Sequence, residues 1–339
     1  MSEFNPPLPP YPPAPGMPPF GHVLPMSFGQ ILDRIFRLTR ANIRPFLIIG
    51  VFPLVVVIAF EAVFFGGLFL AGAFHGPAAV QDPTAALWIM IPEFLLFLPI
   101  MFVVYGLYYG ASAYTAVQAD HGMKVSVGEA FRHAWSKLGR YIWLYFLRAL
   151  IIAIPIAIVA FLVAVGALLL GLIPAMATHG ENPDPALLFF LIPLGIIFYI
   201  GAFVYAIIMS LRYSLAFPVC VHENITAGQA LKRSGKLTSG AKGRIFLMAL
   251  VIYAIGYAAE MILFAVGMFM FAIGALLVGG NPQAHLVLTI TLAVIGGLVL
   301  LVLFFVWFAL LMAAYSIAFA VFYRDQCLRK DGLLAAPAQ

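Results

Sequence analysis

The sequence predicts an all-α polytopic membrane protein with six transmembrane helices in three parallel repeats, each an amphipathic interfacial helix plus a transmembrane hairpin. Of the 339 residues, 64% are hydrophobic and only 9% are charged, whereas a soluble domain has about 25% charged residues. Six apolar runs are each longer than the roughly 20 residues that a helix needs to cross a bilayer. A short helix-start pattern also occurs three times along the chain. Lipid is therefore expected to be the solvent for most of the surface.

The recurring pattern is a Ser or Thr followed three residues later by Gln or Glu. Its hydroxyl residues, Ser27, Ser126 and Thr226, are 99 and then 100 residues apart. This is a capping box, in which the two side chains satisfy backbone N–H groups at the start of a helix. A tyrosine among small and apolar residues recurs near the far end of each unit (Tyr114, Tyr213 and Tyr315). Repetition at both ends indicates an internal repeat of about 100 residues.

The chain divides into three parts. Residues 1–25 contain ten prolines and almost no charge, which predicts a disordered cytoplasmic arm, with a docking peptide for an SH3-like partner as the alternative. The membrane domain is expected at residues 26–323, with repeats at about 26–119, 125–221 and 225–323. Residues 324–339 are predicted to form a disordered cytoplasmic tail.

Within each repeat an amphipathic helix precedes two spans. The first such helix is predicted over Ser27–Arg44 and is expected to end at Pro45. The second begins at Ser126 and the third at Thr226. The spans that follow in order are expected at about 46–74, 85–119, 141–177, 186–221, 245–278 and 286–323.

Orientation follows from the distribution of charge. All 18 Lys and Arg residues lie in the N-terminal segment, in the two loops that carry amphipathic helices, in the C-terminal tail or at the adjoining span ends (Arg148 and Arg212), and the three hairpin tips have none. By the positive-inside rule, both termini and the amphipathic helices are expected on the cytoplasmic side of a bacterial inner membrane.

The basic faces of the amphipathic helices are candidates for contact with anionic lipid headgroups. The candidate contacts are Arg34, Arg37, Arg40, Arg44, Arg132, Lys137, Arg140, Lys232, Arg233 and Lys236. Membrane lipids are thus the expected partners, together with a protein partner whose identity the sequence leaves open, and no nucleic acid is expected.

Three acids and two bases fall within or beside the spans. Glu93 is interpreted as a helix-start carboxylate, and the other four, Glu61, Glu260, Arg148 and Arg212, are the candidate functional residues. Glu61 and Glu260 each lie 34 residues after a capping residue. Because a carboxyl group in hydrocarbon is costly, it is normally functional or paired. Two interpretations stay open here, a proton- or cation-coupled site and a structural pair with Arg148 or Arg212.

Motifs for catalysis and cofactors are absent from the sequence, which has no P-loop, GxGxxG at a strand–helix junction, HExxH, GxSxG or CxxC pattern. We therefore predict no enzyme, no cofactor and no metal site, although the hairpin tips do carry histidines and acidic residues. Gly106 and Gly110 form a GxxxG pattern, which permits close helix packing.

The stretch Phe28–Leu38, followed by Arg44-Pro45-Phe46-Leu47 and an apolar span, resembles the bacterial glycerophosphoryl diester phosphodiesterase membrane-domain family. The similarity is best at residues 27–50 and at the starts near 126 and 226. The resemblance implies six spans. In some members this region precedes a catalytic barrel, but no position of this sequence matches the active site of that barrel.

The function predicted from these observations is a non-catalytic membrane module, as a scaffold, accessory or regulatory protein that interacts with anionic lipids. The alternative is a transporter or channel, for lipids or a proton-coupled solute, which would use Glu61 and Glu260. A membrane-embedded lipid enzyme is a third class, suggested by the family name alone.

Overall fold

The structure, a computed structural model, describes residues 25–70, 83–177, 185–278 and 286–331. These residues form helices and connecting turns, and no strand occurs among them. Most of residues 1–25, the three hairpin tips and the last eight residues lie outside this part, so the predictions made for them are not addressed.

Six long helices are apolar enough to cross a membrane, which confirms the predicted number of spans. They are α2 (Ile43–Leu70), α4 (Pro83–Asp120), α6 (Leu138–Ala177), α7 (Pro185–Arg212), α10 (Lys242–Val278) and α11 (Leu286–Asp331). Four short helices complete the described fold, α1 (Phe28–Ala41), α5 (Val127–Ser136), α8 (Ala216–His222) and α9 (Ala227–Thr238).

The three short helices α1, α5 and α9 begin where the sequence predicts. Ser27 accepts a hydrogen bond from the Gln30 amide at 3.4 Å, and the Gln30 side chain accepts one from the Ser27 amide at 2.8 Å. Ser126 accepts from the amide of Glu129 at 3.2 Å. The Thr226 amide donates to the side chain of Gln229 at 3.1 Å. These bonds satisfy N–H groups that have no partner within the helix.

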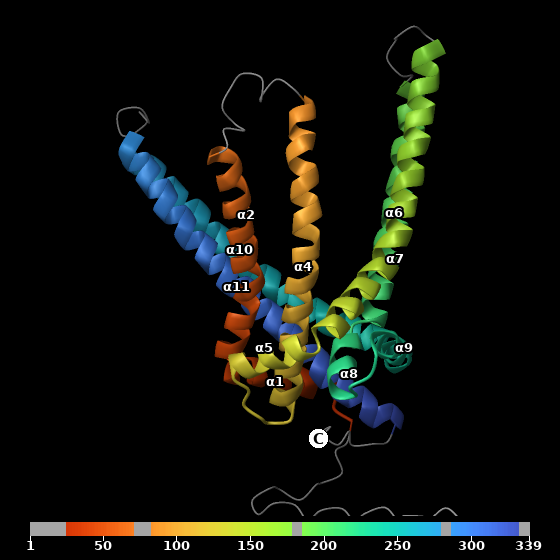
Figure 1. The fold of residues 1–339 in the computed structure, drawn as a ribbon, viewed down its shortest axis with the longest axis vertical. Coiled ribbons are helices and arrows are strands. Elements are labelled where there is room, and N and C mark those ends of the chain that lie inside the picture. The colour runs from red at the N-terminus through yellow and green to blue at the C-terminus, as the bar shows by residue number, and fades with distance from the viewer. Residues whose placement is uncertain (1–24, 71–82, 178–184, 279–285, 332–339) are drawn as a thin grey trace, which may run out of the picture.

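Figure 1 shows the long helices diverging from one end of the molecule, where the four short helices gather. We call this end, with the adjoining ends of the long helices, the base. Helices α6 and α7 form one arm, α10 and α11 tilt to the other side, and α2 and α4 stand between them. The buried core lies mainly at the base, whereas apolar side chains farther along the arms are exposed. In a bilayer these apolar side chains would contact lipid acyl chains and not water, so their exposure would carry no hydrophobic penalty.

Glycine sets how closely two of the long helices approach. Gly106 and Gly110 of α4 face Ile142 and Tyr141 of α6, and a Cβ atom at Gly110 would lie 2.4 Å from the Tyr141 ring. The GxxxG pattern therefore serves packing between α4 and α6, as the sequence predicts.

The predicted end of the first short helix is wrong, and the fourth span contains a helix break that the sequence analysis did not predict. The first short helix ends at Ala41, and Pro45 lies in the first turn of α2, where its missing N–H costs no hydrogen bond. The fourth membrane segment ends at His222, close to the predicted end at 221, but its helix breaks after Arg212, and α8 follows. A continuous helix would bring the ring of Pro218 against the Ser214 carbonyl. The freed carbonyl of Arg212 instead accepts bonds from Ser234 and Thr238 at 2.9 and 3.1 Å.

The predicted disordered tail from residue 324 is also wrong in its first part. Helix α11 continues to Asp331, and Asp325, Gln326 and Cys327 are buried. Their burial at the base, together with the ion pairs described next, gives this segment the tertiary contacts that hold it helical.

Candidate functional site

A buried carboxylate at the end of α4 joins three helices of the base. Asp120 accepts a hydrogen bond from Nε of Arg34 at 2.6 Å, and its backbone carbonyl accepts a second bond from Arg34 at 2.7 Å. Arg324 of α11 lies 3.4 Å from the other carboxylate oxygen. The Asp120 side chain is 3% exposed. Two guanidinium groups thus compensate one buried charge and tie α1, α4 and α11 together.

A second buried carboxylate, Asp325 of α11, holds the segment that precedes α1. It accepts from the backbone amide of Met26 at 2.8 Å, from Arg329 at 2.8 Å and from Arg244 at 3.3 Å. The same two arginines donate to the carbonyl of Met26, at 2.8 Å from Arg329 and 3.2 Å from Arg244. Asp325 itself is fully buried. The segment at Met26, directly before α1, is therefore fixed to α10 and α11 by a closed set of charged hydrogen bonds.

The third ion-pair group lies at α9. Arg233 pairs with Asp331, at the end of α11, and with Glu223 at 3.1 Å. Tyr323 donates a hydrogen bond to Glu223 at 3.1 Å. The hydrogen bond to Asp331, aided by Glu223, raises the pKa of Arg233 above its usual value. This guanidinium is therefore held charged and fixed between two helices.

Sequence reasoning missed these acids, and it assigned two of their partners to lipid headgroups. Arg34 and Arg233 are engaged inside the protein instead. A signal was present: Asp120, Glu223 and Asp325 each stand near the base end of the second apolar segment of a predicted hairpin. Which cation each acid meets could not be read from the chain, because the partners come from distant segments.

Most of the other predicted headgroup contacts are exposed, and their side chains make no hydrogen bond or ion pair with any described residue. These are Arg37, Arg40, Arg44, Arg132, Lys232 and Lys236. Lys137 and Arg140 differ, since both donate to the side chain of Asn224, at 3.0 and 2.7 Å. Exposed aromatic residues accompany the cations, with Phe36 of α1 49% exposed and Trp135 of α5 65% exposed.

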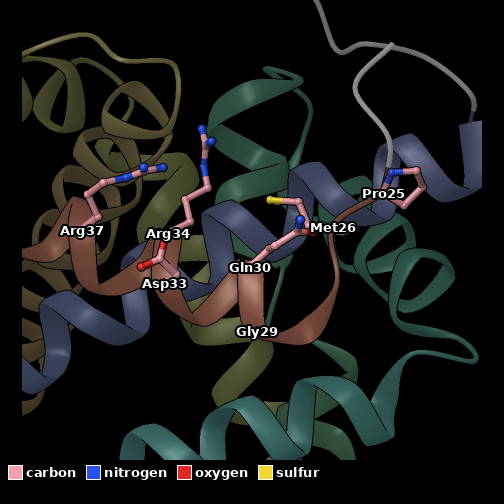
Figure 2. A pocket seen from close by; sticks show the side chains of 7 residues that line it. All are labelled: Pro25, Met26, Gly29, Gln30, Asp33, Arg34 and Arg37. Carbon is pink, nitrogen blue, oxygen red and sulfur yellow. The ribbon is translucent and has the colours of Figure 1, made fainter. Parts of the chain in front are cut away.

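A shallow depression of about 480 Å³ lies along α1. Figure 2 shows Arg34 and Arg37 extending from the same side of this helix, with Pro25 and Met26 at the other end. The lining residues are Pro25, Met26, Gly29, Gln30, Asp33, Arg34 and Arg37. They combine the charged side chains of Asp33, Arg34 and Arg37 with the apolar surface of Pro25 and Met26.

The four predicted intramembrane residues are not brought together. Glu61 is half-buried on α2 and Glu260 is exposed on α10, and neither forms an ion pair or hydrogen bond with the part of the chain that the structure describes. Neither of the candidate partners, Arg148 or Arg212, forms an ion pair with these carboxylates within that part. Arg212 lies over the ring of Tyr213, 5.7 Å from its centroid.

The chain was compared with known protein families, curated proteins and solved structures. No match was found in any of the three.

Two histidines lie at a water-sized cavity of about 10 Å³ in the base. The rings of His121 and His222 are 5.6 Å apart, and Asp120, Tyr323 and Arg324 also line the cavity. Burial lowers the pKa of His121, as do Arg324 and Arg34, while Asp120 opposes them. The imidazole is thus favoured in its neutral form.

Within the described ranges, no three His, Cys, Asp or Glu side chains are placed to hold a metal ion. The histidines and acids of the hairpin tips lie outside those ranges. Both cysteines, Cys220 and Cys327, are free and buried, which makes them poor nucleophiles.

Proposed function

We propose that this chain is a non-catalytic membrane module, a scaffold, accessory or regulatory protein of the bacterial inner membrane that engages anionic lipids. The observation that carries the proposal is the division of the cations on α1, α5 and α9. One set is locked into ion pairs inside the base, and the other is exposed beside Phe36 and Trp135. Exposed cations next to exposed aromatic side chains suit the headgroup region of a bilayer.

The proposal includes three parallel repeats. Each capped short helix precedes two long apolar helices in the chain. The residues seven positions after the three caps are Arg34, His133 and Arg233. Arg34 bonds to the end of α4, His133 stacks on Tyr114 of α4 with ring centroids 4.0 Å apart, and Arg233 bonds to Glu223. Equivalent positions thus anchor each short helix to the base end of a spanning segment, which supports a common structural plan.

The lipid contact can be tested with a triple variant, Arg37→Gln, Arg40→Gln and Arg44→Gln. Each basic residue near an anionic surface contributes about 1 kcal/mol, so the enrichment of phosphatidylglycerol around the protein should fall several-fold. Arg34 is left unchanged because it pairs with Asp120. The measurement is the lipid composition retained by the protein after extraction from bilayers that contain equal amounts of phosphatidylglycerol and phosphatidylcholine.

The matched control replaces the same three residues with lysine and should keep the enrichment, because the charge is kept. High salt should weaken the enrichment in the wild type. Equal phosphatidylglycerol enrichment in the glutamine variant and the wild type would reject the proposed role of these cations.

We further propose that the base, with both termini, faces the cytoplasm, as the positive-inside rule predicts. The two native cysteines are buried and should react slowly, so a single Lys124→Cys substitution adds one accessible thiol on the base side. A membrane-impermeant maleimide should label this variant only after the cells are opened. Labelling in intact cells would show the opposite orientation.

The transport alternative remains a prediction, with no geometry among the described residues that favours it, since neither Glu61 nor Glu260 has a polar partner there. We also propose that this chain is related to the phosphodiesterase membrane-domain family. We infer no phosphodiesterase activity from that relationship. Loss of pH-dependent solute flux in a Glu61→Gln, Glu260→Gln variant would bring the transport alternative back.

A further inference from the structure

Three tyrosines from two helices stack where α4 crosses α6. The ring of Tyr145 on α6 lies against those of Tyr105 and Tyr109 on α4, with centroids 5.5 and 5.6 Å apart and nearly parallel planes. Tyr109 also stacks on Phe217, at 5.0 Å. The crossing at Gly106 makes this approach possible. The rings are thus fixed in place, and their hydroxyl groups come from one small region of the span.

These hydroxyl groups lack the partners that two other tyrosines in the spans, Tyr205 and Tyr315, have. Tyr205 donates to the carbonyl of Ile151 at 2.8 Å, and Tyr315 donates to that of Ala249 at 3.1 Å. In contrast, no hydrogen bond joins the hydroxyl of Tyr105, Tyr109 or Tyr145 to a described residue. All three side chains are only partly buried. Because hydrocarbon offers no hydrogen bond, three unsatisfied hydroxyls in a span indicate an acceptor supplied from outside the chain.

A cation, Arg148, lies near two of these tyrosines, Tyr109 and Tyr145. Arg148 follows Tyr145 by three residues on α6, which places both on one face of the helix. Its guanidinium group interacts electrostatically with Tyr109 and Tyr145. No carboxylate in the described ranges pairs with it. Arg148 also lies eight residues beyond Arg140, which is about 12 Å farther along the helix axis. An uncompensated cation at this depth requires an anion or access to water.

We propose that Arg148 and the hydroxyls of Tyr105, Tyr109 and Tyr145 form a binding site for a phosphate group. All of these groups can donate hydrogen bonds, and the guanidinium has no acceptor atom, so the site suits an anion with several oxygens. A phospholipid is the favoured source, because apolar side chains farther along α6 are exposed to acyl chains, among them Ile154, Ile158 and Phe161.

This site is separate from the headgroup contacts proposed for the short helices. Those contacts are exposed, numerous and charge-driven, whereas the tyrosine–arginine site holds one phosphate group by directed bonds within the span. It deepens the proposed interaction with lipids without depending on it, because the two sites share no residue.

The test uses the full chain purified in a maltoside detergent, which contains no phosphate. Native mass spectrometry during titration with phosphatidylglycerol should show one tightly bound lipid per chain. Diacylglycerol with the same acyl chains should not bind. An Arg148→Gln variant should bind phosphatidylglycerol at least tenfold more weakly. A Tyr105→Phe, Tyr109→Phe, Tyr145→Phe variant keeps the stacked rings, loses the hydroxyls and should also bind at least tenfold more weakly.

A Tyr253→Phe, Tyr257→Phe variant is the matched control, since it removes two hydroxyls from another stacked tyrosine pair in a span. It should bind as the wild type does. An Arg148→Lys variant should recover part of the affinity, and an unchanged melting temperature in each variant would show that the fold is retained.

A parallel titration with inorganic phosphate separates the two sources. If inorganic phosphate displaces the lipid, the site is supported and its ligand includes soluble phosphates. If only phosphatidylglycerol binds, the site is supported as a lipid site. Binding of phosphatidylglycerol no tighter than that of diacylglycerol, or full binding by both site variants, would overturn the proposal. The lipid enrichment that depends on Arg37, Arg40 and Arg44 should be unchanged in Arg148→Gln, so either proposal can fail alone.

Discussion

Replacing Asp325 with alanine should destabilise the protein by about 3–5 kcal/mol, because it removes one partner of a buried charge group and leaves the others uncompensated. The carboxylate is fully buried and accepts hydrogen bonds from Met26, Arg244 and Arg329. Its loss should also release the segment before α1 from α10 and α11. Thermal unfolding in detergent measures the first effect, and protease cleavage near Met26 measures the second.

The matched control is Asp33→Ala, which removes an exposed carboxylate without a partner among the described residues. It should change the stability by less than about 0.5 kcal/mol. A triple variant, Asp325→Ala with Arg244→Met and Arg329→Met, should recover part of the lost stability, because it removes the uncompensated charges as well. If Asp325→Ala melts at the same temperature as the Asp33→Ala control, the carboxylate does not hold the base together.

Replacing Gly110 with valine should separate α4 from α6 and destabilise the protein by about 1–3 kcal/mol or more, the usual cost of overpacking. An added Cβ atom would lie 2.4 Å from Cδ2 and 2.8 Å from Cε2 of Tyr141. The Tyr141 side chain is fully buried and cannot turn aside without moving its neighbours. Thermal unfolding measures the loss, and the phosphatidylglycerol titration should weaken as well, because the tyrosine site is formed at the same helix crossing.

Gly166→Val on α6 is the control for this substitution, since an added Cβ atom there meets nothing within 4 Å. It should leave the stability close to that of the wild type. Combining Gly110→Val with Tyr141→Ala should destabilise the protein by less than the sum of the two single changes, because removing the Tyr141 ring makes room for the new side chain. Simple additivity would show that the crossing does not depend on this contact.

The six spans, the starts of α1, α5 and α9, and the packing role of Gly106 and Gly110 could be predicted from the sequence alone. Each of these depends on residues within a few positions of one another: a long apolar run, a hydroxyl three residues before a Gln or Glu, or two glycines one helical turn apart. These features depend on neighbouring residues and not on tertiary contacts. The local sequence pattern was therefore sufficient to predict them.

The break after Arg212, the extension of α11 to Asp331 and the partners of the buried acids were decided only by the tertiary structure. Arg34 meets Asp120 across 86 positions, and Met26 meets Asp325 across 299. A basic side chain on a short helix contacts either a lipid headgroup or a buried carboxylate, and the helix end that lies beside it decides which. The three stacked tyrosines and Arg148 come together for the same reason, because close packing of α4 on α6 joins residues about 40 positions apart. Local sequence rules fix which segments enter the membrane, and long-range packing fixes which polar groups remain for a ligand.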